Sequence, residues 1–284
     1  MTRAAAPAAV RWTAYVAIAI VFAIACAFLS NWQFARNTER ASQLALVEKN
    51  YDAPSVPLSD VLAPGAELAA SDEWQPVELV GEYIADDALL VRNRPHGGTA
   101  AFEVLVPFRL ADGRVIVLNR GWVPPGEHQP TPDVVPAPPA GEIEVIARLR
   151  PGEPRPSAGR TADEGQVPTI NLGLIADAVS AETRADLEPG AYAIVVTEDP
   201  APASMPRALE APTDDPGPHL SYAIQWILFA VMGFIFIGYV IRTEVRLRRE
   251  EREDRDAGRP KTRTPAPTRR DRDAEDEDAL LDAR

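Results

Sequence analysis

The sequence has little cysteine, histidine and lysine, and these shortages exclude several classes of site. Among 284 residues there is one cysteine, Cys26, and there are three histidines. A disulfide framework and a cysteine-based zinc site are excluded, because each needs several cysteines. The sequence also lacks the motifs of serine hydrolases, phosphate-binding loops, zinc proteases and dinucleotide-binding domains. We therefore do not expect an enzyme.

Two long apolar runs determine the expected class. Residues 12–29 hold 18 positions without a charged side chain, and residues 220–241 hold 22. A spanning helix needs roughly 20 mainly apolar residues, because a helix rises about 1.5 Å per residue through about 30 Å of hydrocarbon. We predict antiparallel transmembrane helices at residues 12–30 and 219–241. The first is expected to be an uncleaved anchor, since its apolar run is long for a signal peptide.

Basic residues beside the two runs predict the orientation of the chain. Two arginines precede the first run, and four follow the second run before residue 250. Basic residues concentrate on the cytoplasmic side of a membrane. We expect residues 1–11 and a disordered tail at 242–284 in the cytoplasm, and residues 31–218 on the outer side. Arg36 and Arg40 oppose this orientation, but they are outnumbered.

The segment between the runs has the composition of one β-rich domain. Six stretches alternate polar and apolar residues or are rich in β-branched residues, near 77–84, 89–92, 102–110, 114–120, 142–149 and 191–197. Asp112-Gly113 provides a hairpin turn between the third and fourth stretches. The expected fold class is a membrane α+β protein, in which two transmembrane helices flank an extracytoplasmic, mostly antiparallel sheet.

The outer domain is strongly acidic. Residues 37–218 hold 29 of the 42 acidic residues and 13 of the 29 basic ones, which gives a net charge of −16. Such a surface is repelled by nucleic acids and by anionic lipid. We therefore expect no nucleic acid partner, and contact with lipid only through the two helices.

His219 opens the second apolar run, together with two aromatic residues at helical spacing. Tyr222 and Trp226 follow at i+3 and i+7, so they share a helix face with it. Trp32, Gln33 and Arg36 end the first run and should lie at the same depth. Such a set suits a haem, with imidazole on iron, rings on the macrocycle and guanidinium on a propionate. The alternative is an interfacial belt that only anchors the helices.

Three stretches of the chain, in the same order, resemble the Surfeit locus protein 1 family of cytochrome c oxidase assembly factors. The first is Trp32-Gln33-x-x-Arg36. The second contains Arg92-Asn93-Arg94-Pro95, Asp112-Gly113-Arg114 and Asn119-Arg120-Gly121-Trp122-Val123-Pro124. The third is His219-Leu220-Ser221-Tyr222, followed by Trp226. Together they cover about residues 12–242, most of the chain.

The resemblance implies a non-enzymatic role in the respiratory chain. It implies a chaperone that binds haem a transiently and delivers it to the catalytic subunit of the oxidase, with that subunit and the haem a synthesis machinery as partners. His219 is then the candidate axial ligand of the haem iron and Arg36 the propionate partner. Trp32, Gln33, Tyr222 and Trp226 would complete the cofactor site. Arginine outnumbers lysine 27 to 2, which favours a bacterial plasma membrane as the location.

Two other functions stay open on the sequence. The first is a membrane-tethered scaffold that stabilises oxidase subunits without binding haem. The second is an envelope enzyme or sensor, which would need a cleft with titratable residues in the outer domain, for instance around Arg92, His96 and Glu103.

The central motif also has two interpretations. Asn119, Arg120, Gly121 and Trp122 could form a docking surface, together with Arg92 and Arg94. They could equally be structural, with Gly121 at a bend, Trp122 in the core and Arg120 paired with a local acid.

Overall fold

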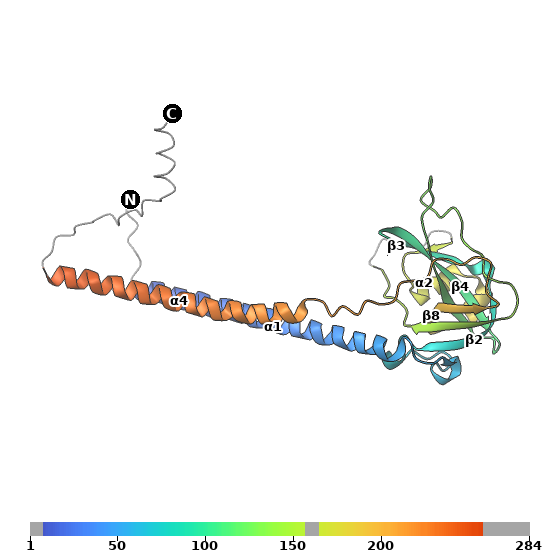
Figure 1. The fold of residues 1–284 in the computed structure, drawn as a ribbon, viewed down its shortest axis with the longest axis horizontal. Helices are drawn as coiled ribbons and strands as arrows, with labels where there is room; N and C mark the ends of the chain where they lie inside the picture. Colours follow the sequence, from blue (N-terminus) through green and yellow to red (C-terminus); the bar gives the residue numbers. More distant parts are fainter. Residues whose placement is uncertain (1–7, 157–164, 258–284) are drawn as a thin grey trace, which may run out of the picture. The chain divides into compact units, whose positions relative to one another are not determined.

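The computed structural model describes residues 8–156 and 165–257, and these form two compact units (Figure 1). One unit contains the residues up to 34 and those from 219 onward. The other contains residues 35–218. Helix α1 (Ala8–Asn50) contributes residues to both units.

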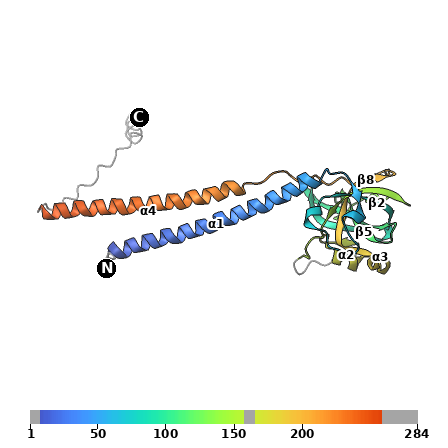
Figure 2. The same ribbon diagram turned by 90° about the horizontal axis from the view of Figure 1, so that it is seen from below.

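The first unit is a pair of long helices. The N-terminal part of α1 lies beside α4 (His219–Asp256), and the two run in opposite directions (Figures 1 and 2). Both helices are long and apolar enough to cross a membrane. They contain the predicted spans and continue beyond them at their charged ends.

One expectation for the C-terminal tail is corrected. Residues 242–256 were expected to be disordered, but α4 continues through them to Asp256. Ion pairs at i, i+4 support this extension, with Arg246 to Glu250 at 2.9 Å and Arg249 to Glu253 at 3.0 Å. The rest of that tail, residues 258–284, lies outside the described residues.

Small side chains and polar contacts hold the helix pair together. Ser30 is buried and its hydroxyl donates a hydrogen bond of 2.9 Å to the backbone oxygen of Ala223. Cys26 is buried as well. Near the opposite end, Glu244 accepts a hydrogen bond of 2.8 Å from Trp12 and pairs with Arg11. Close approach of backbones at small residues is the usual way in which helices pack in membranes.

The second unit is built on one eight-stranded sheet. Its strands are β1 (Val56–Pro57), β2 (Pro76–Tyr83), β3 (Leu89–His96), β4 (Thr99–Leu110), β5 (Val115–Val123), β6 (Ile143–Arg150), β7 (Gln166–Val167) and β8 (Leu187–Asp199). The strand order is β1-β2-β6-β8-β5-β4-β3-β7, and β2 also pairs with β4. This extra pairing closes β2, β6, β8, β5 and β4 into a ring.

The sheet is mixed, which corrects the expectation of mostly antiparallel pairing. β1 pairs with β2, β3 with β7 and β5 with β8 in parallel. The expectation followed from the hairpin at Asp112-Gly113, which does join β4 and β5 in antiparallel. A hairpin fixes only the strands next to it, whereas parallel partners need long connections. β8 pairs with β5 only after a long proline-rich loop (residues 124–139), β6, β7 and two short helices.

Two short helices connect β7 to β8. The stretch 172–187 forms α2 (Leu172–Ala178) and α3 (Ala181–Ala185), with a break at Val179 and Ser180. The side chain of Ser180 caps α3 by accepting from the Thr183 amide. Three single turns of 3-10 helix complete the unit, at η1 (Leu58–Asp60), η2 (Ala70–Asp72) and η3 (Ala85–Asp87).

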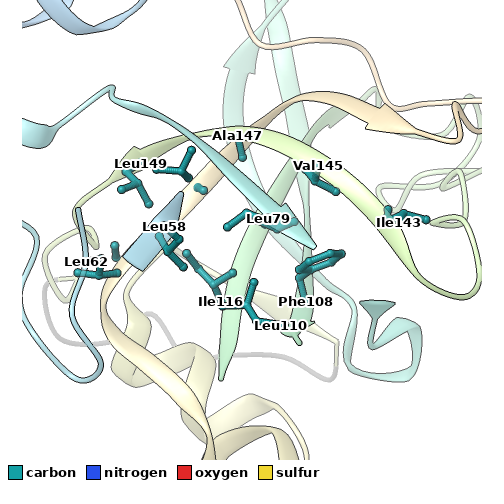
Figure 3. Close-up of a cluster of buried hydrophobic side chains, with 14 residues drawn as sticks. Leu58, Leu62, Leu79, Phe108, Leu110, Ile116, Ile143, Val145, Ala147 and Leu149 are labelled. Atoms are coloured by element: carbon teal, nitrogen blue, oxygen red, sulfur yellow. The ribbon is translucent and has the colours of Figure 1, made fainter. Parts of the chain in front are cut away.

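The main hydrophobic core fills the ring of strands (Figure 3). All five strands contribute inward side chains, among them Leu79, Phe108, Ile116, Val145 and Ala193. A second cluster lies on the outer side, where Val117 and Tyr192 pack with Ile175 of α2. β5 therefore has both faces buried, and all nine of its residues are buried.

A buried ion pair lies on the same inward row of β5. Arg120 follows Ile116 and Leu118 on this row, and it forms a bidentate pair with Glu198 at 2.7 and 2.9 Å. Both side chains are 0% exposed. Tyr83 donates to Glu198 at 2.6 Å, and burial together with this carboxylate raises the pKa of Tyr83. Arg120 also donates to the carbonyl of Pro136 and so attaches the proline-rich loop.

We expect Arg120→Ala to destabilise the sheet domain by about 3–5 kcal/mol, because it leaves a buried carboxylate uncompensated. Urea unfolding of the full-length protein in detergent, followed by pulse proteolysis, measures this. Arg109→Ala is the matched control, since its partners Glu182 and Asp186 are exposed. Its effect should stay within about 1 kcal/mol. Equal losses of stability in the two variants would contradict a stabilising role of the buried pair between Arg120 and Glu198.

A second prediction uses Cys26 as a reporter of the helix pair. Ser30→Leu should overpack the contact with α4, and Cys26 should then react with a maleimide roughly fivefold faster or more, because about 1 kcal/mol of strain shifts an opening equilibrium by that factor. Ser221→Leu adds the same side chain at an exposed position of α4. Faster reaction of Cys26 in both variants, or in neither, would contradict the buried contact between Ser30 and Ala223.

Candidate functional site

His219 and Gln33 meet at the contact between α1 and α4. Nδ1 of His219 lies 2.9 Å from Oε1 of Gln33. An amide oxygen only accepts, so the ring must carry its proton on Nδ1 and donate it. In the neutral imidazole, Nε2 then keeps its lone pair. The contact thus selects the tautomer of His219 that is able to coordinate a metal through Nε2.

Trp226 lies on the same face of α4 as His219, while Tyr222 and Trp32 are more exposed. His219 and Trp226 are half-buried, and the buried Ala223 lies between them along the helix. Trp226 makes an edge contact with Phe229, at 5.7 Å between ring centroids. Tyr222 and Trp32 each expose 47% of their surface. The structure therefore groups His219, Gln33 and Trp226 on the helix contact, with two further aromatic rings on the outer surface.

Arg36 belongs to the second unit. Its side chain pairs with Glu39 at 2.7 Å, and both side chains are more than half exposed. An exposed pair of this kind contributes at most about 1 kcal/mol. The imidazole of His219 thus contacts Gln33, and Arg36 contacts a carboxylate on its own helix.

The central motif has a structural role in this fold. Asn119 donates to Glu103 at 2.7 Å and accepts from the Gly121 amide at 3.0 Å. Gly121 has φ of 118°, and a Cβ there would lie 2.3 Å from the carbonyl oxygen of Arg207. Trp122 is buried and its backbone exchanges two 2.8 Å hydrogen bonds with Arg207. The bend and the core position agree with the structural interpretation, but the acid that pairs with Arg120 lies 78 residues away instead of nearby.

A cleft of about 420 Å³ lies on the outer surface of the ring. Glu103, Arg94 and His96 form a network at one end of it. Arg94 donates to Glu103 at 2.8 Å and to Glu153 at 2.5 Å, and Nε2 of His96 lies 2.9 Å from Glu103. Burial opposes the charge of Arg94, but the two carboxylates raise its pKa above the usual value. His96 also stacks on Trp122, with 5.4 Å between ring centroids.

The cleft contains two of the three residues named for an envelope enzyme or sensor. His96 and Glu103 line it, whereas Arg92 lines a neighbouring pocket with Thr169. The described residues that line the cleft include no serine, threonine or cysteine. The carboxylate of Glu103 already accepts from Arg94 and Asn119. The cleft therefore offers groups for binding, without a nucleophile beside its histidine.

Sequence reasoning missed the other end of this cleft. Arg148, Arg150 and Tyr192 line it, together with Tyr51 and Trp74. The alternation of buried residues on β6 does place the two arginines on one face of the strand. Their aromatic neighbours come from distant parts of the chain, so no local pattern could have identified the set.

Comparison with known proteins agrees with these features over most of the chain. The model of the SURF1 family matches residues 20–231, which include Gln33, the central motif and His219. Uncharacterized SURF1-like proteins of Mycobacterium bovis and Mycobacterium tuberculosis are each 33% identical over 248 residues, which is 85% of this chain and 87% of theirs. A SURF1-like protein of Monosiga brevicollis is 29% identical over 135 residues, or 43% of this chain and 47% of its own.

The match covers well over half of the chain and includes the sheet domain and parts of both long helices. The protein therefore belongs to the SURF1 family, a family of assembly factors linked to cytochrome c oxidase.

Proposed function

We propose that this protein is an assembly factor for cytochrome c oxidase that binds haem a transiently and assists its delivery to the catalytic subunit. The two helices cross the bacterial plasma membrane, with both termini in the cytoplasm and the sheet domain outside. The observation that carries the proposal is the contact between Nδ1 of His219 and Gln33. It prepares one ring nitrogen, Nε2, for coordination.

The residues of the helix pair fit a haem in their chemistry. Histidine is the commonest axial ligand of haem iron, and metal-ligating histidines almost always donate their other N–H to an oxygen acceptor. Gln33 is such an acceptor. Haem a would supply an iron centre, a flat apolar ring and two propionates. Within this chain, His219 would coordinate the iron, Gln33 would fix the imidazole ring, and Trp32, Tyr222 and Trp226 would provide aromatic contact area.

Arg36 is the propionate partner in this proposal. Its pairing with Glu39 is exposed and weak, so a propionate is able to replace the carboxylate of Glu39 at little cost. A guanidinium binds either carboxylate through the same fork of N–H groups.

The single histidine of the helix pair suits a carrier that must release its cargo. The other two histidines of the chain, His96 and His128, belong to the sheet domain. A haem held by one imidazole is bound less firmly than one held by two. Transient binding therefore follows from the same residues that give recognition.

The first test is an absorbance spectrum of the full-length protein, purified after co-expression with haem a synthesis. We expect a haem absorbance signal that His219→Ala weakens strongly. His128→Ala is the control, because this residue lies exposed in the proline-rich loop. A colourless protein that still co-purifies with the oxidase would favour the scaffold function, and an unchanged spectrum in His219→Ala would remove this residue from the site.

The second test addresses Gln33. Gln33→Leu should weaken haem retention roughly 10- to 100-fold, the usual cost of losing an outer partner of a ligating histidine. Gln33→Glu keeps an acceptor and should retain the haem. Gln43→Leu makes the same change at an exposed position of α1 and should have no effect. Retention that is equal in Gln33→Leu and wild type would show that the hydrogen bond does not prepare the ligand.

A further inference from the structure

We propose that the cleft in the sheet domain binds a small organic acid with an apolar body, whose carboxylate is held by Arg148 and Arg150. The cleft measures about 420 Å³, within the range of small-molecule sites. Its walls come from five strands, from the loop residues Tyr51, Trp74 and Glu153, and from the segment 208–210. All of these residues belong to the second unit, so the site is independent of the helix pair.

The two arginines lie side by side with their planes fixed. They are separated by one residue on β6 and point to the same face, roughly 7 Å apart. The Arg148 guanidinium lies 3.6 Å from the centroid of the Tyr51 ring, and the Arg150 guanidinium lies 3.9 Å from that of Trp74. Stacking on an aromatic face orients a guanidinium and leaves its edge for hydrogen bonds.

Trp74 is held in a strained conformation to make this contact. Its φ is 72°, which is unusual for a bulky residue. The Trp74 amide donates to the carbonyl of Leu149 at 2.8 Å, and Asn50 donates to the carbonyl of Glu73 at 2.8 Å, which fixes the backbone on both sides. Strain of this kind persists where the surroundings enforce it, and it is frequent at ligand-binding sites.

At this end of the cleft, Arg150 has one hydrogen-bond donor that no acceptor among the described residues matches. Nε of Arg150 is buried and has no partner among the residues that the structure describes, while Nη1 pairs with Glu73 at 2.6 Å. Arg148 donates to the Tyr51 carbonyl at 2.7 Å and lies 3.5 Å from Asp52, whose side chain is 90% exposed. A buried guanidinium N–H without an acceptor is costly, and a bound carboxylate would supply the missing oxygen.

Tyr192 adds one more donor at the same place. It is the cross-strand neighbour of Arg150 on β8. Burial raises the pKa of Tyr192 to about 12, so at neutral pH the phenol keeps its proton. At the opposite end of the cleft, the donors of Arg94 are matched by Glu103 and Glu153. Among the described residues that line the cleft, the buried side-chain donor without a hydrogen-bond partner is Nε of Arg150.

Apolar residues line two walls of the cleft and suit a carbon skeleton, and the acidic Glu210 follows Leu209 in the lining. Ile194, Val195 and Val196 of β8 line one wall, and Ala208 and Leu209 line another. The segment that carries Leu209 is anchored by the two hydrogen bonds between Trp122 and Arg207. These contacts favour an acid with an apolar body over a fully hydrated inorganic anion. The net charge of −16 on residues 37–218 repels anions in general, so saturable binding of an acid requires a specific local site.

The test is calorimetric titration of the full-length protein in detergent with 3-phenylpropionate. We expect saturable binding, and the neutral 3-phenylpropionamide should bind about tenfold more weakly or worse, because it cannot replace a charge-assisted hydrogen bond. Arg150→Gln should weaken binding of the acid by about the same factor. Arg109→Gln, at an arginine of the same domain that does not line the cleft, should change it less than about twofold.

Several outcomes would overturn the proposal. These are equal affinity for acid and amide, full binding by Arg150→Gln, absence of saturable binding by the acid, and inorganic phosphate binding as tightly as the acid. If Arg150→Gln does not fold, Arg148→Gln makes the same comparison at the neighbouring arginine. His219→Ala should bind the acid as the wild type does, so the acid-binding test does not depend on whether the haem proposal is correct.

Discussion

The hydrogen bond between His219 and Gln33 determines what the helix pair is able to do. A neutral imidazole has two tautomers, with its proton on either Nδ1 or Nε2. The acceptor on the neighbouring helix removes this freedom and leaves Nε2 unprotonated. The buried contact between Ser30 and Ala223, one turn away on each helix, sets the register in which the two side chains meet.

The sheet domain depends on a different constraint, the closure of five strands into a ring. Closure removes sheet edges and creates an interior that must be filled. Apolar side chains fill most of it, and the bidentate pair of Arg120 and Glu198 occupies the remainder. The close approach of the segment around Arg207 to Gly121 then carries the chain over the outer face of the ring. The cleft with its two stacked arginines exists because of that crossing.

Much of this could be predicted from the sequence, and the failures have a common cause. The apolar runs predict two long helices, and the alternating stretches predict a β-rich domain, because both signals are local. The parallel pairing of β5 with β8 could not be predicted, since it depends on how long connections return. The same holds for the partner of Arg120: an acid was expected nearby, but tertiary structure supplies Glu198.

In the candidate site too, local features were predicted and tertiary contacts were not. His219 was identified because it opens the second apolar run together with two aromatic residues, and its spacing to Trp226 follows from helix geometry. Gln33 was named with Trp32 and Arg36 as part of the same set, but its hydrogen bond to His219 was not predicted. Which residue of a helix faces its neighbour depends on how the two helices pack. For the same reason, no pattern in the sequence predicts that Tyr51, Trp74, Arg148 and Arg150 lie together.

The most direct test of this account is the tautomer of His219. The chain contains only three histidines, so ¹⁵N-histidine labelling of the full-length protein in detergent gives few signals, and His219→Ala assigns the relevant one. For the neutral ring, the account predicts a proton on Nδ1 and a free lone pair on Nε2. A ring protonated on Nε2 alone would contradict it, because the nitrogen offered to a metal would then be the one that faces Gln33.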